Sequence, residues 1–172
     1  MNREEVILVN EHDVEMGVME KLEAHQKGLL HRAISVFIFN ESGDMLLQQR
    51  AFSKYHSPGL WTNTCCSHPR PNEVSIDAAV RRLNEEMGLI CNLEKRTEFI
   101  YKVGFDNGLT EHEYDHVYKG IINSEPIINK EEVEDYQWIN PDLLLRMVEE
   151  YPENFTPWFN ILIKNHWKEI IS

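Results

Sequence analysis

The 172-residue sequence contains no long hydrophobic run and only three cysteines. No stretch approaches the ~20 consecutive apolar residues that a membrane-spanning helix needs, so we expect no contact with a membrane. The first five residues, 1–5, lack the basic segment and apolar core of a secretory signal. Cys65 and Cys66 are adjacent and the cysteine count is odd. We therefore expect reduced thiols in a cytoplasmic protein rather than a disulfide framework.

Basic residues are also scarce, since 17 Lys and Arg stand against 29 Asp and Glu, giving a net charge of −12. This balance argues against a nucleic-acid partner or an anionic membrane surface, because either needs a basic stripe. An acidic protein that binds a phosphorylated metabolite must gather its few cations locally or recruit a divalent metal. The sequence has no glycine-rich nucleotide-binding loop, and we expect neither a flavin nor a nicotinamide cofactor.

Linkers, internal repeats and low-complexity tracts are absent as well. At roughly 150 residues per domain, the length predicts one domain over residues 1–172. Hydrophobic residues make up 42% and charged residues 27%, which is typical of a globular protein. Monomer and homodimer are both open at this stage.

The remaining pattern predicts a mixed α/β chain. Apolar residues recur at helical spacing over Ser75–Met87, and Gly88 follows as a C-terminal cap. Asn140-Pro141 and Thr156-Pro157 are typical helix starts, and they predict helices over 143–150 and 157–167. The residues between the helices favour strands over 5–10, 32–40, 45–50, 61–67, 97–103, 111–122 and 135–139. A glycine-containing turn suggests that 32–40 and 45–50 form a β-hairpin.

A first candidate for chemistry is Glu111-His112-Glu113. In a strand, Glu111 and Glu113 would share one face about 7 Å apart. Two such carboxylates repel each other unless a cation or solvent separates them. The pattern therefore indicates either a solvated strand face or a His/Glu site for a divalent metal whose other ligands come from distant segments.

A second candidate is the helix 75–87, where four charged residues could pair along an exposed face. A longer pattern includes them: Glu73, seven residues, Arg81, then Glu85-Glu86-Met87-Gly88-Leu89. Over residues 67–89 this pattern resembles the Nudix box. Two positions depart from it, because Ser67 replaces the first glycine and Arg82 replaces a glutamate that binds metal in the hydrolases of that superfamily. The resemblance therefore predicts the fold, while Arg82 argues against diphosphate hydrolysis.

A third feature is the string Trp61-Thr62-Asn63-Thr64-Cys65-Cys66-Ser67-His68-Pro69. With Leu30-His31-Arg32-Ala33 and Glu111-X-Glu113-Tyr114-Asp115-His116, it closely resembles type I isopentenyl-diphosphate isomerases. The resemblance runs in order from about residue 21 to 158. It implies a Nudix-type fold, with a mixed β-sheet sandwiched between helices in one compact domain. It also implies interconversion of isopentenyl and dimethylallyl diphosphate in isoprenoid biosynthesis, by protonation and deprotonation through a tertiary carbocation.

The resemblance also implies roles for individual residues. Cys66 and Glu113 match the acid–base pair of the family, and Tyr101 matches a tyrosine beside the glutamate. Trp158 matches an aromatic residue that stabilises the cation. The residues that match ligands of one divalent metal are His25, His31, His68, Glu111 and Glu113. This donor set suits Mn²⁺ or Zn²⁺, with Mg²⁺ as a third option in vitro.

The resemblance also implies which residues bind the diphosphate end of the substrate. Four basic residues match the family's substrate-side cations: Lys21, Arg50, Lys54 and Arg82. Glu86 matches a ligand of a second cation, Mg²⁺, which would bridge to the diphosphate together with the Cys66 backbone carbonyl. Two alternatives are a Nudix-type diphosphate hydrolase and a non-catalytic metal-binding domain on the same fold.

Overall fold

The computed structural model describes residues 3–172, which form a nine-stranded mixed sheet with helices on both faces. Its central strand is β3 (His31–Phe39), rich in the β-branched and aromatic residues that favour strands. In β3, every residue except Arg32 is buried. This strand pairs in parallel with β8 (Thr110–Ile121), from His31 opposite Glu113 to Phe39 opposite Ile121. The antiparallel hairpin of β7 (Glu94–Gly104) with β8 extends the sheet on that side.

On its other side β3 pairs with β6 (Cys65–Ser67) and, at one position, with β1 (Glu5–Val9). The remaining strands form two groups. β2 (Glu15–Glu20) forms a hairpin with β1, and β4 (Met45–Arg50) pairs with β5 (Trp61–Thr62) and β9 (Val133–Ile139). The predicted hairpin of β3 with β4 is only partly confirmed. These strands pair at Phe39 and Met45 alone, beside the turn, because β3 then follows β8 while β4 follows β9.

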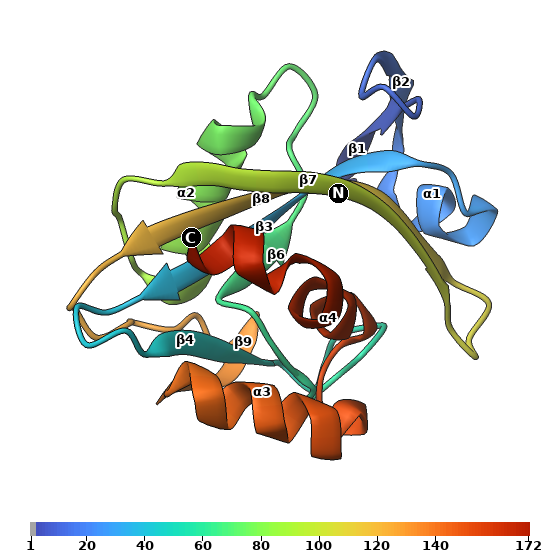
Figure 1. Ribbon diagram of the computed structural model, residues 1–172. Helices are drawn as coiled ribbons and strands as arrows, with labels where there is room; N and C mark the ends of the chain where they lie inside the picture. The colour runs from blue at the N-terminus through green and yellow to red at the C-terminus, as the bar shows by residue number, and fades with distance from the viewer. Residues whose placement is uncertain (1–2) are drawn as a thin grey trace.

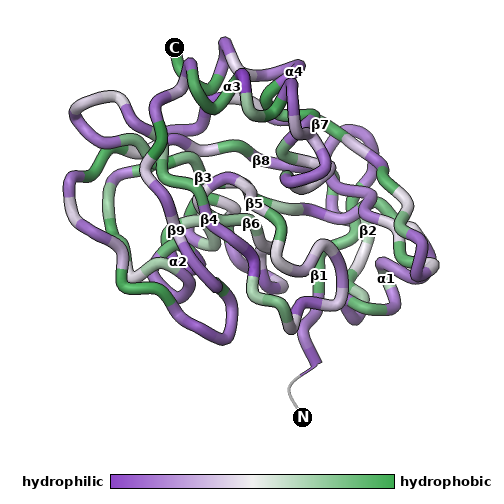
Figure 2. The backbone as a smooth tube through the Cα atoms, turned by 90° about the horizontal axis from the view of Figure 1, so that it is seen from below, coloured by the Kyte–Doolittle hydropathy of each residue, from purple (hydrophilic) through white to green (hydrophobic). Residues whose placement is uncertain are grey.

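Helices cover the two faces of β3 (Figure 1). α2 (Ser75–Met87) lies on one face, and α3 (Pro141–Glu150) and α4 (Pro157–Ile171) lie on the other. The alternation of β3 residues supplies both cores, since Ile34, Val36 and Ile38 pack toward α2 while Phe37 and Phe39 pack toward α3 and α4. Figure 2 shows much of the central strands in hydrophobic colours and the outer loops mainly in hydrophilic ones. The expected mixed sheet between helices is thus confirmed.

Most helix ends follow the predicted signals, but α4 ends at Ile171 rather than at 167 and α3 begins at Pro141 rather than at 143. α2 has the predicted bounds, and Gly88 ends it in a left-handed conformation with φ 64°. A Cβ at this glycine would lie 2.7 Å from the carbonyl oxygen of Ile127. The Asn140 side chain caps α3 by accepting bonds from two backbone N–H groups, and Thr156 caps α4. A short 3₁₀ turn at Pro152–Asn154 joins these two helices.

One helix was not predicted. α1 (Lys21–Lys27) has only seven residues, and the side chain of Glu20 caps it by accepting bonds from the Leu22 and Glu23 N–H groups. Gly28 ends it with φ 65°. Within residues 3–172 no helix is both long and apolar enough to cross a membrane. All three cysteines are free thiols, as expected.

Candidate active site

The parallel pairing of β3 with β8 brings the predicted metal ligands together. The register places His31 opposite Glu113, and the alternation of β8 puts Glu111 on the same face as Glu113. His25 comes from α1 and His68 follows β6 directly. One ligand atom from each of these five side chains lies within 4.8 Å of all the others. Glu111 and Glu113 therefore do not lie on a solvated strand face, because both are buried among imidazoles.

Backbone carbonyls orient two of the imidazoles toward the cluster. Nδ1 of His25 lies 2.6 Å from the Lys21 carbonyl oxygen, and Nδ1 of His31 lies 2.8 Å from that of Leu29. Since a carbonyl only accepts, each Nδ1 carries a proton, and in the neutral ring each Nε2 presents a lone pair. Both Nε2 atoms and Oε2 of Glu111 are buried without a hydrogen-bond partner. Imidazole and carboxylate donors left bare in this way fit a divalent cation.

The two carboxylates share one electrostatic environment. Burial and the neighbouring Glu111 charge raise the pKa of Glu113 to about 7. Burial opposes ionisation of Glu111 too, but the neighbouring Glu113, His25 and His56 side chains hold its pKa well below the usual range. Without a cation, the pair therefore keeps a proton to higher pH than an isolated glutamate would. A bound cation would replace that proton as the source of positive charge.

The predicted acid–base residues lie in the same pocket. The hydroxyl of Tyr101 donates to Oε2 of Glu113 at 2.7 Å. The Cys66 thiol donates to Oδ1 of Asn63 at 2.9 Å and accepts from the Trp158 indole N–H at 3.2 Å. Burial, together with the nearby Asp115 carboxyl, raises the pKa of Cys66 to about 12. Cys66 is thus a thiol that carries its proton, while the adjacent Cys65 is fully buried in the core, as expected.

Four basic side chains line this pocket, as the resemblance implied: Lys21, Arg50, Lys54 and Arg82. Each one contacts groups within the protein. Lys21 pairs with Glu4 at 2.8 Å, Lys54 pairs with Glu132, and Arg82 pairs with Glu86 at 2.6 Å. Nε of Arg50 and Nε of Arg82 are buried N–H groups without a partner. Bare guanidinium donors of this kind are suited to phosphate oxygens.

The charged residues of α2 divide between two sides. Arg81 faces outward, where its guanidinium makes two bonds to Glu73 at 2.7 and 2.8 Å. Arg82 and Glu86 face the pocket, and Glu86 is only 4% exposed. The Glu86 carboxylate accepts from Arg82 on one oxygen and from Gln48 at 2.9 Å on the other. The interpretation of this helix as an exposed ion-paired face therefore holds for its outer residues only.

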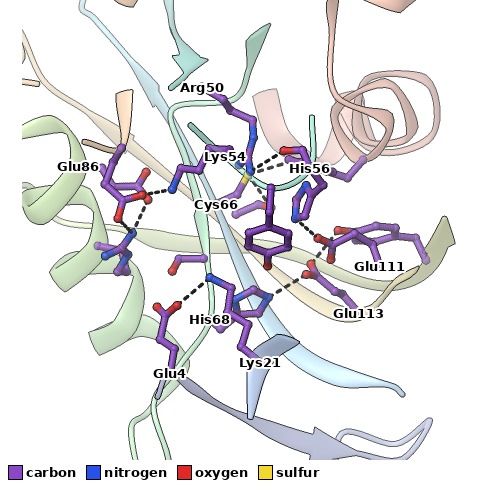
Figure 3. Close-up of a pocket in the computed structure, with 17 residues that line it drawn as sticks. Glu4, Lys21, Arg50, Lys54, His56, Cys66, His68, Glu86, Glu111 and Glu113 are labelled. Carbon is purple, nitrogen blue, oxygen red and sulfur yellow. Dashed lines mark hydrogen bonds and ion pairs between the residues drawn. The ribbon is translucent and has the colours of Figure 1, made fainter. Parts of the chain in front are cut away.

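Figure 3 shows how these groups are arranged. In this view Cys66 lies between Glu86 on one side and Glu111, Glu113 and His56 on the other. Trp158 lines the pocket with a buried indole, and the guanidinium of Arg50 lies 5.2 Å from the centre of its ring. The ring therefore already binds one cation through its face.

Sequence reasoning missed several pocket residues: Glu4, Ser35, Tyr55, His56 and Glu132. Of these residues, His56 contacts a predicted metal ligand directly, because its Nε2 lies 2.7 Å from Oε1 of Glu111. It comes from an irregular loop, where no periodicity signals which side chain turns inward. The sequence does contain a signal for Ser35, because it is a polar residue within a strongly apolar strand. In the structure its hydroxyl faces inward and donates to Asp115 at 2.7 Å.

Comparison with known proteins gives a consistent result. The NUDIX domain family matches residues 29–159. An isopentenyl-diphosphate Delta-isomerase of Pectobacterium atrosepticum is 52% identical over 171 residues, covering 98% of this chain and 96% of its own. Isopentenyl-diphosphate Delta-isomerase 2 of Aromatoleum aromaticum is 51% identical, covering 90% of this chain and 82% of its own.

Solved structures share the fold at lower identity. A crystal structure of a Deinococcus radiodurans protein superimposes with a TM-score of 0.78 at 20% identity, covering 94% of this chain and 98% of its own. A MutT protein from Methanosarcina mazei gives a TM-score of 0.68 at 18% identity, covering 81% and 94%. Likeness at this identity shows the arrangement of the sheet and helices, which agrees with the fold described above.

Proposed function

We propose that this chain, which belongs to the isopentenyl-diphosphate Delta-isomerases of the NUDIX domain family, interconverts isopentenyl diphosphate and dimethylallyl diphosphate. One observation carries the proposal. A single pocket holds the half-buried Cys66 thiol and the buried Glu113 carboxyl, with four basic side chains beside them. This combination suits a substrate with an alkene at one end and a diphosphate at the other.

The chemistry requires a proton donor and a proton acceptor around the carbon chain. Protonation of the terminal alkene carbon gives a tertiary carbocation, and loss of a proton from the neighbouring carbon shifts the double bond. An alkene is a very poor base, so the acid must be placed in the pocket and shielded from water. We assign the two proton-transfer roles to Cys66 and Glu113. Tyr101 would orient the Glu113 carboxyl through the hydrogen bond that it donates to Oε2.

The carbocation needs an environment that stabilises positive charge without trapping it. Trp158 lines the pocket, and its indole N–H is bonded to the Cys66 sulfur. We propose that its ring stabilises the cation, an interaction worth about 2 kcal/mol when water is excluded. Because the indole is nearly fully buried, the ring keeps its position without the substrate.

Two divalent cations complete the proposal. His25, His31, His68, Glu111 and Glu113 would hold Mn²⁺ or Zn²⁺, with Mg²⁺ as a third option, and the ion would supply the charge that two buried carboxylates require. Glu86 and the Cys66 backbone carbonyl would hold a second Mg²⁺ with the diphosphate. Lys21, Arg50, Lys54 and Arg82 would bind the phosphate oxygens directly.

We further propose one catalytic domain over residues 1–172, acting in the cytoplasm in isoprenoid biosynthesis, as a monomer or a homodimer. The test is incubation with isopentenyl diphosphate, Mg²⁺ and Mn²⁺, followed by ³¹P NMR. We expect the diphosphate to stay intact while dimethylallyl diphosphate accumulates. Release of phosphate or diphosphate would instead favour the hydrolase alternative, and metal uptake without turnover would favour a binding domain.

A further inference from the structure

His56 lies in the loop between β4 and β5, held over the metal-ligand end of the pocket. Two backbone bonds close the base of this loop, from the Arg50 N–H to the Leu60 carbonyl at 2.9 Å and from the Gly59 N–H to the Arg50 carbonyl at 3.1 Å. Its outer side is tied to the β7–β8 turn, where the Asn107 amide donates to the Tyr55 carbonyl at 3.0 Å. The loop is thus anchored on both sides of His56.

The imidazole of His56 is enclosed by aromatic rings. It stacks on Phe105 with ring centres 5.1 Å apart and an angle of 13°, and it meets Trp158 edge-on at 5.6 Å. Arg50, one of the substrate-side cations, donates to the His56 carbonyl at 3.2 Å. The ring is 7% exposed, so packing fixes its orientation. His56 therefore packs against the indole and is bonded through its backbone carbonyl to a phosphate-side cation, at the metal-ligand end of the pocket.

Its polar contact is with Glu111. Nε2 of His56 lies 2.7 Å from Oε1 of Glu111, and both side chains are more than nine-tenths buried. A carboxylate only accepts hydrogen bonds, so the proton of the neutral ring sits on Nε2. Nδ1 of His56 is correspondingly left without a partner, as is Oε2 of Glu111. One oxygen of Glu111 is thus engaged and the other is left bare.

We propose that His56 is a positioning residue that holds Oε1 of Glu111 by a hydrogen bond, so that Oε2 is turned toward the divalent cation. This inference rests on the proposed metal site but concerns a residue outside its five ligands. The neighbouring His25 Nε2 lies 3.2 Å from the same Oε1 but carries no proton in the neutral ring, so His56 is the donor that fixes this oxygen. Outer partners of metal ligands typically change metal affinity by about 10- to 100-fold.

The test is metal affinity of the metal-free protein, measured with Mn²⁺ by electron paramagnetic resonance. His56→Met removes the donor while keeping an unbranched chain of similar length, and His56→Gln places an amide N–H near the Nε2 position. His12→Met is the control, because His12 lies on an exposed turn. We expect the Kd for Mn²⁺ to rise about 10- to 100-fold in His56→Met, to recover in His56→Gln, and to stay unchanged in His12→Met.

Two outcomes would overturn the inference: wild-type affinity in His56→Met, or an affinity in His56→Gln no better than in His56→Met. Circular dichroism of the metal-free variants checks that each is folded. If His56→Met does not fold, His56→Asn takes its place, because its shorter amide cannot reach Glu111. Mn²⁺ binding is measured without substrate. If the wild-type protein showed no isomerase activity, the proposed function would be refuted, but the role of His56 in metal binding could still be tested.

Discussion

Replacing Tyr101 by Phe tests the acid–base assignment with a very small change. The phenol hydroxyl donates to Oε2 of Glu113 at 2.7 Å, and both residues are buried. A hydrogen bond to a charged group is worth about 1.5–3 kcal/mol, which corresponds to roughly 10- to 150-fold in rate. We expect Tyr101→Phe to lower kcat by that factor, because the hydroxyl that orients the Glu113 carboxyl is lost. The KM for isopentenyl diphosphate should change little, since the basic residues are untouched.

Tyr114 provides a matched control. It lies next to Glu113 in β8 but on the opposite face, and its hydroxyl donates to Glu98 at 2.8 Å. Tyr114→Phe therefore removes a tyrosine–carboxylate bond of nearly the same length outside the pocket. Initial rates with a coupled or NMR assay at saturating Mg²⁺ measure the difference. A kcat for Tyr101→Phe within twofold of the Tyr114→Phe value would refute the reasoning.

Three further changes test other parts of the account. Cys66→Ala should keep the fold and the metal affinity but lose most isomerisation; turnover near the wild-type rate would remove Cys66 from the mechanism. Glu132→Gln removes an anion that pairs with Lys54 and Arg82. Partly exposed ion pairs of this kind are worth about 1 kcal/mol at most, so KM should fall up to about fivefold while kcat stays unchanged. A raised KM in steady-state kinetics would contradict this. Gly88→Ala should lower the free energy of unfolding in urea by roughly 1–3 kcal/mol, because its φ is left-handed and a Cβ meets a carbonyl oxygen; an unchanged midpoint would be the contrary result.

The sequence predicted those elements whose signals are local. The bounds of α2 follow from its apolar spacing and from Gly88, and the starts of α3 and α4 follow from Asn140-Pro141 and Thr156-Pro157. α1 was not predicted because seven residues form too few turns to show a helical period. Its N-terminal cap is also a glutamate rather than Ser, Thr, Asp or Asn. β2 was not predicted because Gly17 lies within it and a glutamate stands at each end, so the alternation of apolar and polar residues is broken.

The pairing of strands could not be predicted in the same way. No local pattern states that β3 pairs in parallel with β8, because the partners His31 and Glu113 lie far apart in the chain. The five metal ligands were identified through family resemblance, and the structure places their donor atoms within 4.8 Å. His56 had no such support, since it lies in a loop whose direction depends on contacts with Asn107 and Phe105.

The central claim is that one pocket moves a proton onto one carbon and removes another from a neighbouring carbon. The direct measurement is NMR of isopentenyl diphosphate incubated with the metal-loaded protein in D₂O. The account predicts dimethylallyl diphosphate with deuterium from the solvent in a methyl group, and no free phosphate. Unlabelled dimethylallyl diphosphate, or hydrolysis without isomerisation, would contradict the assignment of proton transfer to Cys66 and Glu113.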